Sequence, residues 1–375
     1  MKFIHLSDLH LGKVIYSKNL LDIQIDLLNQ VVKYMNEQNI ELLVIAGDVY
    51  DRSIPSLEAV NALNSFLDCL INQYHKKVLM ISGNHDSSER LNFASDLLSQ
   101  QGLHIVAFPS KELLPIVIDD VNFYLVPFFK PSYIKYLYQN DTINSYHGAY
   151  QYYLSQQNID FNQTNVLVTH QFIAGNHHAI TSDSEVLLSV GGSEIIDVDL
   201  FEKFDYVALG HLHASQKIKY DYVRYAGSLM KYSFDEVNQV KGMVEVSIEG
   251  KEVTTKTIPL KPTIDLIKVK GLFEDIKNNQ PNLNDYIAIE LLDTKLVPNA
   301  IDYLHNIYPN ILQLTYPNLN NIINTSTTKA NNGFESLTPL ELFGEFYEKI
   351  KNEKMNDEEK QIIENILKGG DNHDA

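Results

Sequence analysis

Side chains of the metal-binding type occur in five short segments, and each segment directly follows an apolar run. The donors are carboxylates, imidazoles and an amide, without sulfur, and such sets suit Mn²⁺, Fe²⁺ or Zn²⁺ better than Ca²⁺. A carboxylate such as Asp48 can also bridge two ions. The residue types therefore favour a divalent-metal site built from Asp8-Leu9-His10, Gly47-Asp48-Val49-Tyr50-Asp51-Arg52, Gly83-Asn84-His85-Asp86, Thr169-His170 and Gly210-His211-Leu212-His213.

Each segment also has an ordinary structural explanation when it is taken alone. Asp8 and Asp48 can serve as turn or cap residues after a strand, and the Gly-Asn pair at 83 and 84 is typical of a turn because both residue types tolerate positive φ. That explanation accounts for neither the His-X-His pair nor the order of all five segments. His5 and His104 lie inside apolar runs, so we expect them to pack rather than to bind metal.

The elements that must position these residues are short strands and intervening helices. Runs rich in Val, Ile, Leu and Tyr predict buried strands at 3–6, 42–46, 78–81, 105–108, 123–126, 166–168 and 206–209. Apolar residues at helical spacing predict helices at 20–35, 57–71 and 91–98. Strand and helix alternate, which predicts an α/β fold. Loops at the strand ends can then bring the five segments to one edge of the sheets.

The last third of the chain is organised differently. Tyr- and Val-rich segments from 216 to about 257 predict antiparallel strands that finish a second sheet, so that the first domain covers 1–260. Residues 263–317 alternate strand-like and helix-like runs, which predicts a small α+β domain. An Asn/Thr-rich linker is expected at 318–333, followed by amphipathic C-terminal helices at 334–368.

Composition and charge exclude several classes of protein. The formal net charge is −18, with 30 Lys and Arg against 48 Asp and Glu, which excludes the basic footprint of a protein that coats nucleic acid. The single cysteine, Cys69, cannot form an intramolecular disulfide and suits a reducing compartment. We find neither a secretory leader nor an apolar run of membrane-spanning length, and therefore expect a cytoplasmic protein with no membrane partner. Because the sequence has no Walker A loop, any control by ATP must come from a partner.

The order Asp-X-His, Gly-Asp-X-X-Asp, Gly-Asn-His-Asp, X-His and Gly-His-X-His resembles the signature of calcineurin-like metallophosphoesterases, over residues 1 to about 240. Within that superfamily, residues 3–13 resemble the SbcD family of nuclease subunits, bacterial relatives of the double-strand-break repair exonucleases. Further resemblance to this family lies in Gly191-Gly192-Ser193-Glu194, Tyr225-Ala226-Gly227-Ser228, Ser233-Phe234-Asp235-Glu236 and the Leu-Thr-Pro-Leu-Glu-Leu-Phe stretch of the tail.

The resemblance implies an α/β two-sheet sandwich flanked by helices, with a small α+β capping domain and C-terminal helices. It also implies two divalent metal ions, with Mn²⁺ as the expected metal. By resemblance, the first ion would be held by Asp8, His10, Asp48 and His213. The second would be held by Asp48, Asn84, His170 and His211, with Asp48 as the bridge.

Three further residues are candidates for the reaction itself. By resemblance, His85 contacts the scissile phosphate or protonates the leaving oxygen. Arg52 is a candidate phosphate contact, although an exposed surface arginine is the more ordinary interpretation. Asp51 stands where some relatives have a histidine, so it is a candidate to orient a ligand instead.

The implied activity is that of a metal-dependent DNA nuclease, a double-strand 3′–5′ exonuclease and a single-strand or hairpin endonuclease. It would act within an SbcCD-type complex that processes DNA ends and hairpins in repair and recombination. The C-terminal helices would dock on the coiled coil of the SbcC ATPase subunit, and helices 57–71 and 91–98 would form a homodimer within a heterotetramer. Two alternatives stay open: a metallophosphoesterase for small phosphodiesters, nucleotides or phosphoproteins, and a scaffold with a vestigial metal site.

Overall fold

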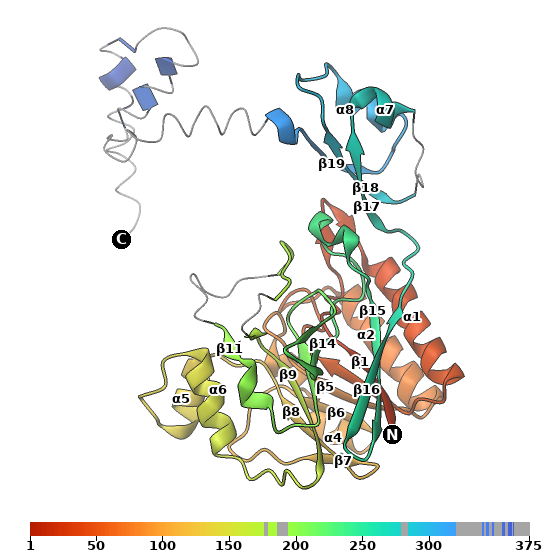
Figure 1. Cartoon of the computed structure of the whole chain (residues 1–375), viewed down its shortest axis with the longest axis vertical. Coiled ribbons are helices and arrows are strands. Elements are labelled where there is room, and N and C mark those ends of the chain that lie inside the picture. The colour runs from red at the N-terminus through yellow and green to blue at the C-terminus, as the bar shows by residue number, and fades with distance from the viewer. Residues whose placement is uncertain are drawn as a thin grey trace. The chain divides into compact units, whose positions relative to one another are not determined.

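The computed structural model describes residues 1–175, 179–185, 194–278 and 284–319, together with single positions between 340 and 363. The chain divides into two compact units (Figure 1). The first comprises Met1–Lys268 with Asn282–Ala288, and the second comprises Val269–Pro281 with Ile289–Ala375. The first unit therefore extends past residue 260 and takes in a second, separate stretch of chain.

One six-stranded sheet of the first unit has the order β16-β15-β1-β4-β5-β6. Strands β1, β4, β5 and β6 are parallel, whereas the β15–β16 hairpin is joined to the sheet by antiparallel pairing of β15 with β1. The strands are β1 (Lys2–Leu6), β4 (Leu42–Ala46), β5 (Lys77–Ile81), β6 (Leu103–Val106), β15 (Gly242–Glu249) and β16 (Glu252–Pro259).

The second six-stranded sheet has the order β13-β14-β12-β9-β8-β7. Its four inner strands are parallel, and the edge strands β7 and β13 are antiparallel to their neighbours. The strands are β7 (Ile116–Ile118), β8 (Val121–Val126), β9 (Thr164–His170), β12 (Tyr206–Gly210), β13 (Gln216–Ile218) and β14 (Tyr220–Tyr225).

The core lies between the two sheets. It joins side chains of the first sheet, such as Phe3 and Val44, to side chains of the second, such as Phe123 and Val168. Residues that alternate with these, such as Leu43, are equally buried, so both faces of the strand are covered. This explains why the strands are continuous apolar runs and confirms the predicted two-sheet sandwich.

Helices cover the outer faces of both sheets. The crossovers between parallel strands place α1 (Leu21–Glu37) and α2 (Leu57–Asp68) on the same side of the first sheet (Figure 1), as the preferred right-handed connection requires. The Ser56 hydroxyl caps α2 by accepting from the Ala59 amide at 3.2 Å. Helices α5 (Pro131–Tyr138) and α6 (Tyr146–Ser155) pack on the second sheet through aromatic side chains.

Two sequence predictions are wrong in their details. The segment 91–98 is not one helix but two short ones, α3 (Ser88–Leu91) and α4 (Ser95–Ser99), because Ala94 between them has a φ of 59°. The strands predicted at 216–257 do not all finish the second sheet, since the β15–β16 hairpin extends the first.

Short elements complete the first unit. They are β2 (Val14–Ile15), β3 (Lys18–Asn19), β10 (Ile173–Ala174), β11 (Ile196–Asp197), a π-helical turn at Cys69–Gln73, and 3₁₀ turns at Val198–Phe201 and Phe234–Asn238.

A three-stranded sheet of order β17-β18-β19 follows, with two short helices. Its elements are β17 (Leu266–Gly271), α7 (Phe273–Lys277), β18 (Tyr286–Leu291), α8 (Ala300–His305) and β19 (Ile311–Thr315). Leu304 and Tyr308 are fully buried, and the Tyr308 hydroxyl donates to the Ile276 carbonyl at 2.6 Å. A small α+β arrangement is therefore present in this part of the chain.

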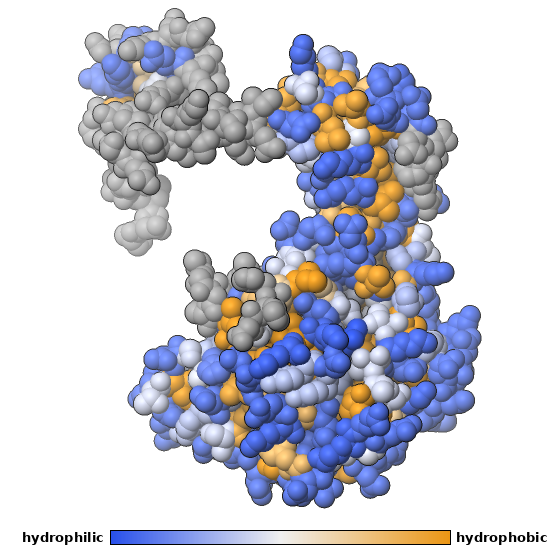
Figure 2. All heavy atoms as spheres, in the orientation of Figure 1, coloured by the Kyte–Doolittle hydropathy of each residue, from blue (hydrophilic) through white to orange (hydrophobic). Residues whose placement is uncertain are grey.

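Several sequence predictions concern residues that the structure does not describe. The linker beyond residue 319, the helices at 334–368 apart from single positions, and Gly191 to Ser193 lie outside the described residues. Among the helices that are described, none combines the length and the apolar character needed to cross a bilayer. Hydrophilic side chains predominate on the face of the first unit seen in Figure 2.

Candidate metal centre

All seven predicted ligands lie at the carboxyl ends of five strands. Strands β1, β4 and β5 of the first sheet supply one group of loops, and β9 and β12 of the second sheet supply the other. Six of the seven residues are at most 4% exposed, and Asn84 is partly buried. The two sheets thus bring together Asp8, His10, Asp48, Asn84, His170, His211 and His213.

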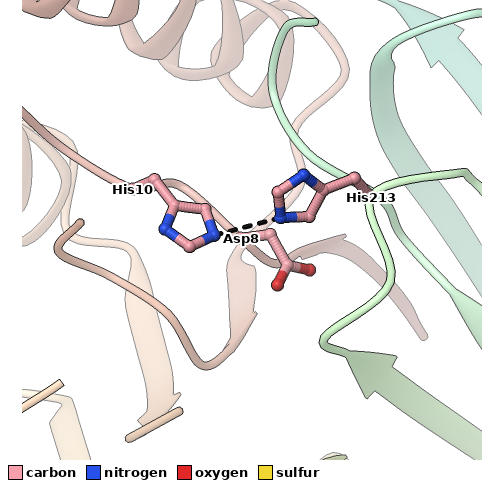
Figure 3. Close-up of side chains that lie close together, drawn as sticks. All are labelled: Asp8, His10 and His213. Carbon is pink, nitrogen blue, oxygen red and sulfur yellow. Dashed lines mark hydrogen bonds between the residues drawn. The ribbon is translucent and has the colours of Figure 1, made fainter. Parts of the chain in front are cut away.

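One group of donors consists of Asp8, His10 and His213 (Figure 3). Their ligand atoms lie within 4.8 Å of one another, and the Nε2 atoms of the two histidines are 3.1 Å apart. The Asp8 carboxylate also accepts from the His211 amide at 3.0 Å. This bond ties the loop after β1 to the loop after β12.

A second group of donors surrounds Asn84. Its Oδ1 atom is 3.0 Å from His170 Nε2 and 3.0 Å from His211 Nδ1. Asp48 lies between the two groups, because its Oδ2 atom is 3.3 Å from His170 Nε2 and 3.7 Å from His10 Nε2. A single carboxylate oxygen is therefore within reach of both.

The orientation of the imidazoles fits metal ligation. His170 Nδ1 is 2.8 Å from the Ala46 carbonyl, which can only accept, so Nδ1 carries a proton and, when the ring is neutral, the lone pair is on Nε2. His213 Nδ1 likewise lies 3.4 Å from the Glu236 carboxylate, which leaves Nε2 bare toward His10. Lone pairs that face other acceptors in a buried site need a proton or a cation between them. The donor set therefore fits divalent ions.

The backbone at this edge is held in unusual conformations. Asp8, His10, Asp48 and His211 have φ values of 51°, 44°, 49° and 111°. Such values cost free energy in residues with a side chain, and they persist only where the surroundings impose them. Four of the seven predicted ligands share this property, which is typical of a preorganised functional site.

Two glycines leave room for the ligands. A Cβ atom on Gly83 would lie 2.1 Å from Asp48 Oδ1, and a Cβ atom on Gly210 would lie 1.9 Å from the Ala46 carbonyl oxygen. Both contacts are far inside van der Waals range. The close approach of the loops thus requires residues without a side chain.

Asp86 holds the loops together from behind. Its carboxylate accepts from the amides of Val49, Tyr50 and Gly83 at 2.9–3.1 Å. Burial and the nearby Asp48 charge raise the pKa of Asp86 to about 6. The three hydrogen bonds of Asp86 fix the loop after β4 relative to the loop after β5.

The pKa values of three predicted ligands are shifted by burial and by their charged neighbours. Burial raises the pKa of Asp8 to about 8. Burial opposes protonation of His170, but the Asp48 carboxylate outweighs it and raises the pKa of His170 to about 9. Burial also disfavours the charged form of Asp48, yet His170 holds the pKa of that carboxyl well below its usual range. At neutral pH the site therefore carries protons on Asp8 and His170 where cations would bind.

We expect metal binding at pH 7 to release about two protons, one from Asp8 and one from His170, because both must be deprotonated to act as ligands. Since protons compete with the metal, affinity should increase with pH until both groups have titrated. Calorimetric titration with Mn²⁺ under argon, in buffers of different ionisation enthalpy, measures the release. A binding enthalpy at pH 7 that is independent of the buffer would contradict this prediction.

The three candidate reaction residues are placed differently. His85 is partly buried, and its backbone amide donates to Asp48 Oδ1 at 2.8 Å. Asp51 Oδ1 is 2.8 Å from Lys13 Nζ and 3.6 Å from His10 Nδ1. The Arg52 side chain is 73% exposed, and its Nε atom is 3.7 Å from Asp51 Oδ2. Arg52 therefore lies at the surface beside the centre.

His10, Asp51 and His85 form a further group whose ligand atoms lie close together. A cation there would adjoin the ammonium group of Lys13, which already pairs with Asp51. The repulsion between these charges argues against an ion at this position.

Two residues that orient the ligands, Gln24 and Glu236, were not predicted from the sequence. Gln24 on α1 donates to the carbonyls of Leu9 and His10 at 2.9 and 2.8 Å. The sequence feature that could have revealed Gln24 is a polar residue within the apolar stripe of a predicted helix. Glu236 contacts His213, and its signal was the Ser-Phe-Asp-Glu stretch, which carried a resemblance but no role.

Comparison with known families agrees with this geometry. Residues 1–215 match the family described as calcineurin-like phosphoesterase, and residues 262–351 match a family described as type 5 capsule protein repressor C-terminal domain. The chain is similar to a solved dimetal phosphatase from Danio rerio, with 12% identity, a TM-score of 0.39, and coverage of 68% of this chain and 98% of that one. The family match over more than half of the chain makes it a metallophosphoesterase, a class of phosphoester hydrolase that uses divalent metal ions.

Two curated relatives are both named as the SbcD component of the nuclease SbcCD. The one from Staphylococcus saprophyticus is 34% identical over 372 residues, or 98% of each chain, and the one from Staphylococcus epidermidis is 37% identical over 321 residues, or 84% of this chain and 85% of that one. The chain belongs to this SbcD family of nuclease subunits. The resemblance seen in the sequence is therefore confirmed.

Proposed function

We propose that this chain is the metal-dependent DNA nuclease subunit of an SbcCD-type complex, hydrolysing phosphodiesters at DNA ends and hairpins. The observation that carries the proposal is the convergence of seven oxygen and nitrogen donors, six of them buried, in a chain of this family. The family name supplies the substrate class, and the donor set supplies the chemistry.

The ligands divide as the family pattern implies. Asp8, His10 and His213 would hold one ion, Asn84, His170 and His211 would hold the other, and Asp48 would be shared by the two. When bound, the ions polarise the phosphate and lower the pKa of the attacking water. Nitrogen and oxygen donors suit Mn²⁺, which we propose as the metal.

His85 acts on the phosphate rather than on an ion. Its Nδ1 atom is 2.9 Å from the Asp51 carbonyl oxygen, so this nitrogen carries a proton and donates a hydrogen bond to that oxygen. Nε2 is then the atom that contacts the phosphate, and in the imidazolium form it donates a proton to the leaving oxygen. Through its carbonyl, Asp51 positions His85, and the exposed Arg52 contacts a neighbouring phosphate.

An exposed apolar surface supports the proposed homodimer. Ile54, Leu57, Phe93 and Leu97 are between 70% and 82% exposed, and they lie in or beside the segments that follow the second and third ligand loops. Large apolar side chains left exposed on these two segments are of the kind that a protein interface buries. In the proposed heterotetramer, the homodimer would bind two SbcC subunits through its C-terminal helices.

The ATPase partner should stimulate cleavage. With a net charge of −18 the isolated chain lacks the basic surface that drives DNA affinity. We therefore expect DNA binding at physiological salt to strengthen at least about tenfold when SbcC and ATP are added. A chain ending at residue 333 should keep its basal cleavage and lose the stimulation. Equal DNA affinity with and without the partner would contradict the prediction.

The proposed function is tested on linear and hairpin-ended duplex DNA with Mn²⁺, and with a chelator control. Cleavage that requires Mn²⁺ supports a nuclease. If no DNA is cut while a small bis-ester is hydrolysed, the chain is instead a phosphoesterase for small substrates, which is the alternative that the site also allows.

A further inference from the structure

A buried ion pair lies directly behind one of the proposed ligands. Glu236 Oε2 is 2.6 Å from Lys241 Nζ, and both side chains are at most 4% exposed. The pair belongs to neither the seven donors nor the three reaction residues. Glu236 lies on the 3₁₀ turn Phe234–Asn238, and Lys241 directly precedes β15.

The pair contacts the ring of His213 through its carboxylate. His213 Nδ1 is 3.4 Å from Glu236 Oε1 and 2.6 Å from the Ser184 hydroxyl. Ser184 in turn donates to Glu236 Oε1. The Nδ1 proton of His213 is therefore linked by a short hydrogen-bond chain to a buried carboxylate.

The lysine and two neighbours hold the backbone of the same residue. Lys241 Nζ donates to the His213 carbonyl at 2.7 Å, and the Ser228 amide donates to this oxygen at 3.1 Å. On the other side, the His213 amide donates to Glu185 Oε1 at 2.6 Å. Ring, amide and carbonyl of one ligand are thus all fixed by polar groups, of which Glu236 and Lys241 are buried.

We infer that Glu236 and Lys241 are positioning residues that hold His213 in the tautomer and orientation needed to ligate a divalent cation through Nε2. The inference rests on the proposed metal role of His213. A carboxylate that accepts from the second nitrogen of a ligating histidine fixes the ring and increases its basicity.

Stability alone does not account for the pair. Burying two charges costs desolvation free energy, and apolar residues of similar size commonly serve stability as well or better. An ionic pair is needed here because one member must accept from His213 Nδ1 and Ser184, while the other neutralises that member and binds the His213 carbonyl.

The test removes both charges at once, because removal of one alone would leave the other buried and unpaired. In E236Q/K241M, we expect the protein to fold and one of the two Mn²⁺ affinities, measured by calorimetry on the full chain, to fall about 10- to 100-fold. The second affinity should change much less. At two equivalents of Mn²⁺, the electron paramagnetic resonance spectrum should lose the signature of two magnetically coupled Mn²⁺ ions.

A matched control is the Glu41–Lys76 pair, whose members directly precede β4 and β5 at the ends of the strands opposite to the ligand loops. Its charged atoms are 2.8 Å apart, the Lys76 side chain is 7% exposed and the Glu41 side chain is 64% exposed, so the control matches the chemistry of the pair but only half of its burial. E41Q/K76M should retain both affinities. Wild-type Mn²⁺ binding in a folded E236Q/K241M variant would overturn the inference.

A second variant keeps the inference testable if the double variant does not fold. S184A removes the hydroxyl between His213 and Glu236 and leaves the ion pair intact, so the same affinity should fall and the fold should remain. Unchanged affinity in S184A would then overturn the inference. If the wild-type chain binds two Mn²⁺ but does not cut DNA, the proposed function fails while the role of Glu236 is still measured.

Discussion

Replacing His85 with alanine should lower kcat by about 10²- to 10⁴-fold, the range for loss of a general acid or base, while two Mn²⁺ ions still bind. His85 belongs to neither of the proposed ligand sets, and its ring is fixed by the Asp51 carbonyl at 2.9 Å. The loss should therefore appear in turnover and not in metal content. Single-turnover cleavage of linear duplex DNA at saturating Mn²⁺ measures the change.

The control for this variant is His305→Ala. His305 lies on the exposed side of α8, far along the chain from the five ligand loops, and its loss should leave cleavage unchanged. A metal stoichiometry below two in His85→Ala would make His85 a ligand, and full activity would remove it from the reaction.

The position of the site could be read from the sequence because the donors follow the strands directly. Strand β4 ends at Ala46 and Asp48 comes two residues later, while His170 is the last residue of β9. In an α/β sandwich both faces of each strand are buried, so catalytic and ligand-binding side chains lie mainly in the loops at the strand ends. The position of each donor directly after a strand was therefore enough to predict that the donors meet at one edge of the sheets.

Long-range pairing could not be read in this way. The β15–β16 hairpin joins β1, more than two hundred residues away, and no local pattern distinguishes that edge from the edge of the second sheet. The break at Ala94 was equally hidden, because alanine favours helix and the φ of 59° is imposed by its surroundings.

The residues behind the ligands were also beyond sequence reasoning. Gln24 reaches the centre from a helix 14 residues beyond His10, and Lys241 reaches it from just before a strand, 28 residues beyond His213. A polar residue on an apolar stripe, or a lysine before a strand, is ordinary until its partners are known. Supporting contacts of this kind become visible only when the fold brings the elements together.

Replacing Gly83 with alanine should prevent two Mn²⁺ ions from binding at adjacent sites. It should also lower activity by about 10²-fold or more, because a catalytic group displaced by about 1 Å costs about that much in rate. The new Cβ atom would lie 2.1 Å from Asp48 Oδ1 and 2.3 Å from the Asp48 backbone nitrogen. A backbone atom cannot move aside as a flexible side chain can, so the bridging carboxylate must shift. Overpacking should also cost about 1–3 kcal/mol of stability.

Gly271→Ala is the matched control, because its Cβ atom would come no closer than 3.4 Å to Ile276, an ordinary contact. Mn²⁺ titration and thermal unfolding of both variants separate the two effects. If Gly83→Ala is destabilised yet binds two Mn²⁺ with wild-type affinity, the close packing of the two loops is not required to place Asp48, and this prediction fails. If it stays folded and loses one or both ions, the close packing of the two loops is what places Asp48 between them.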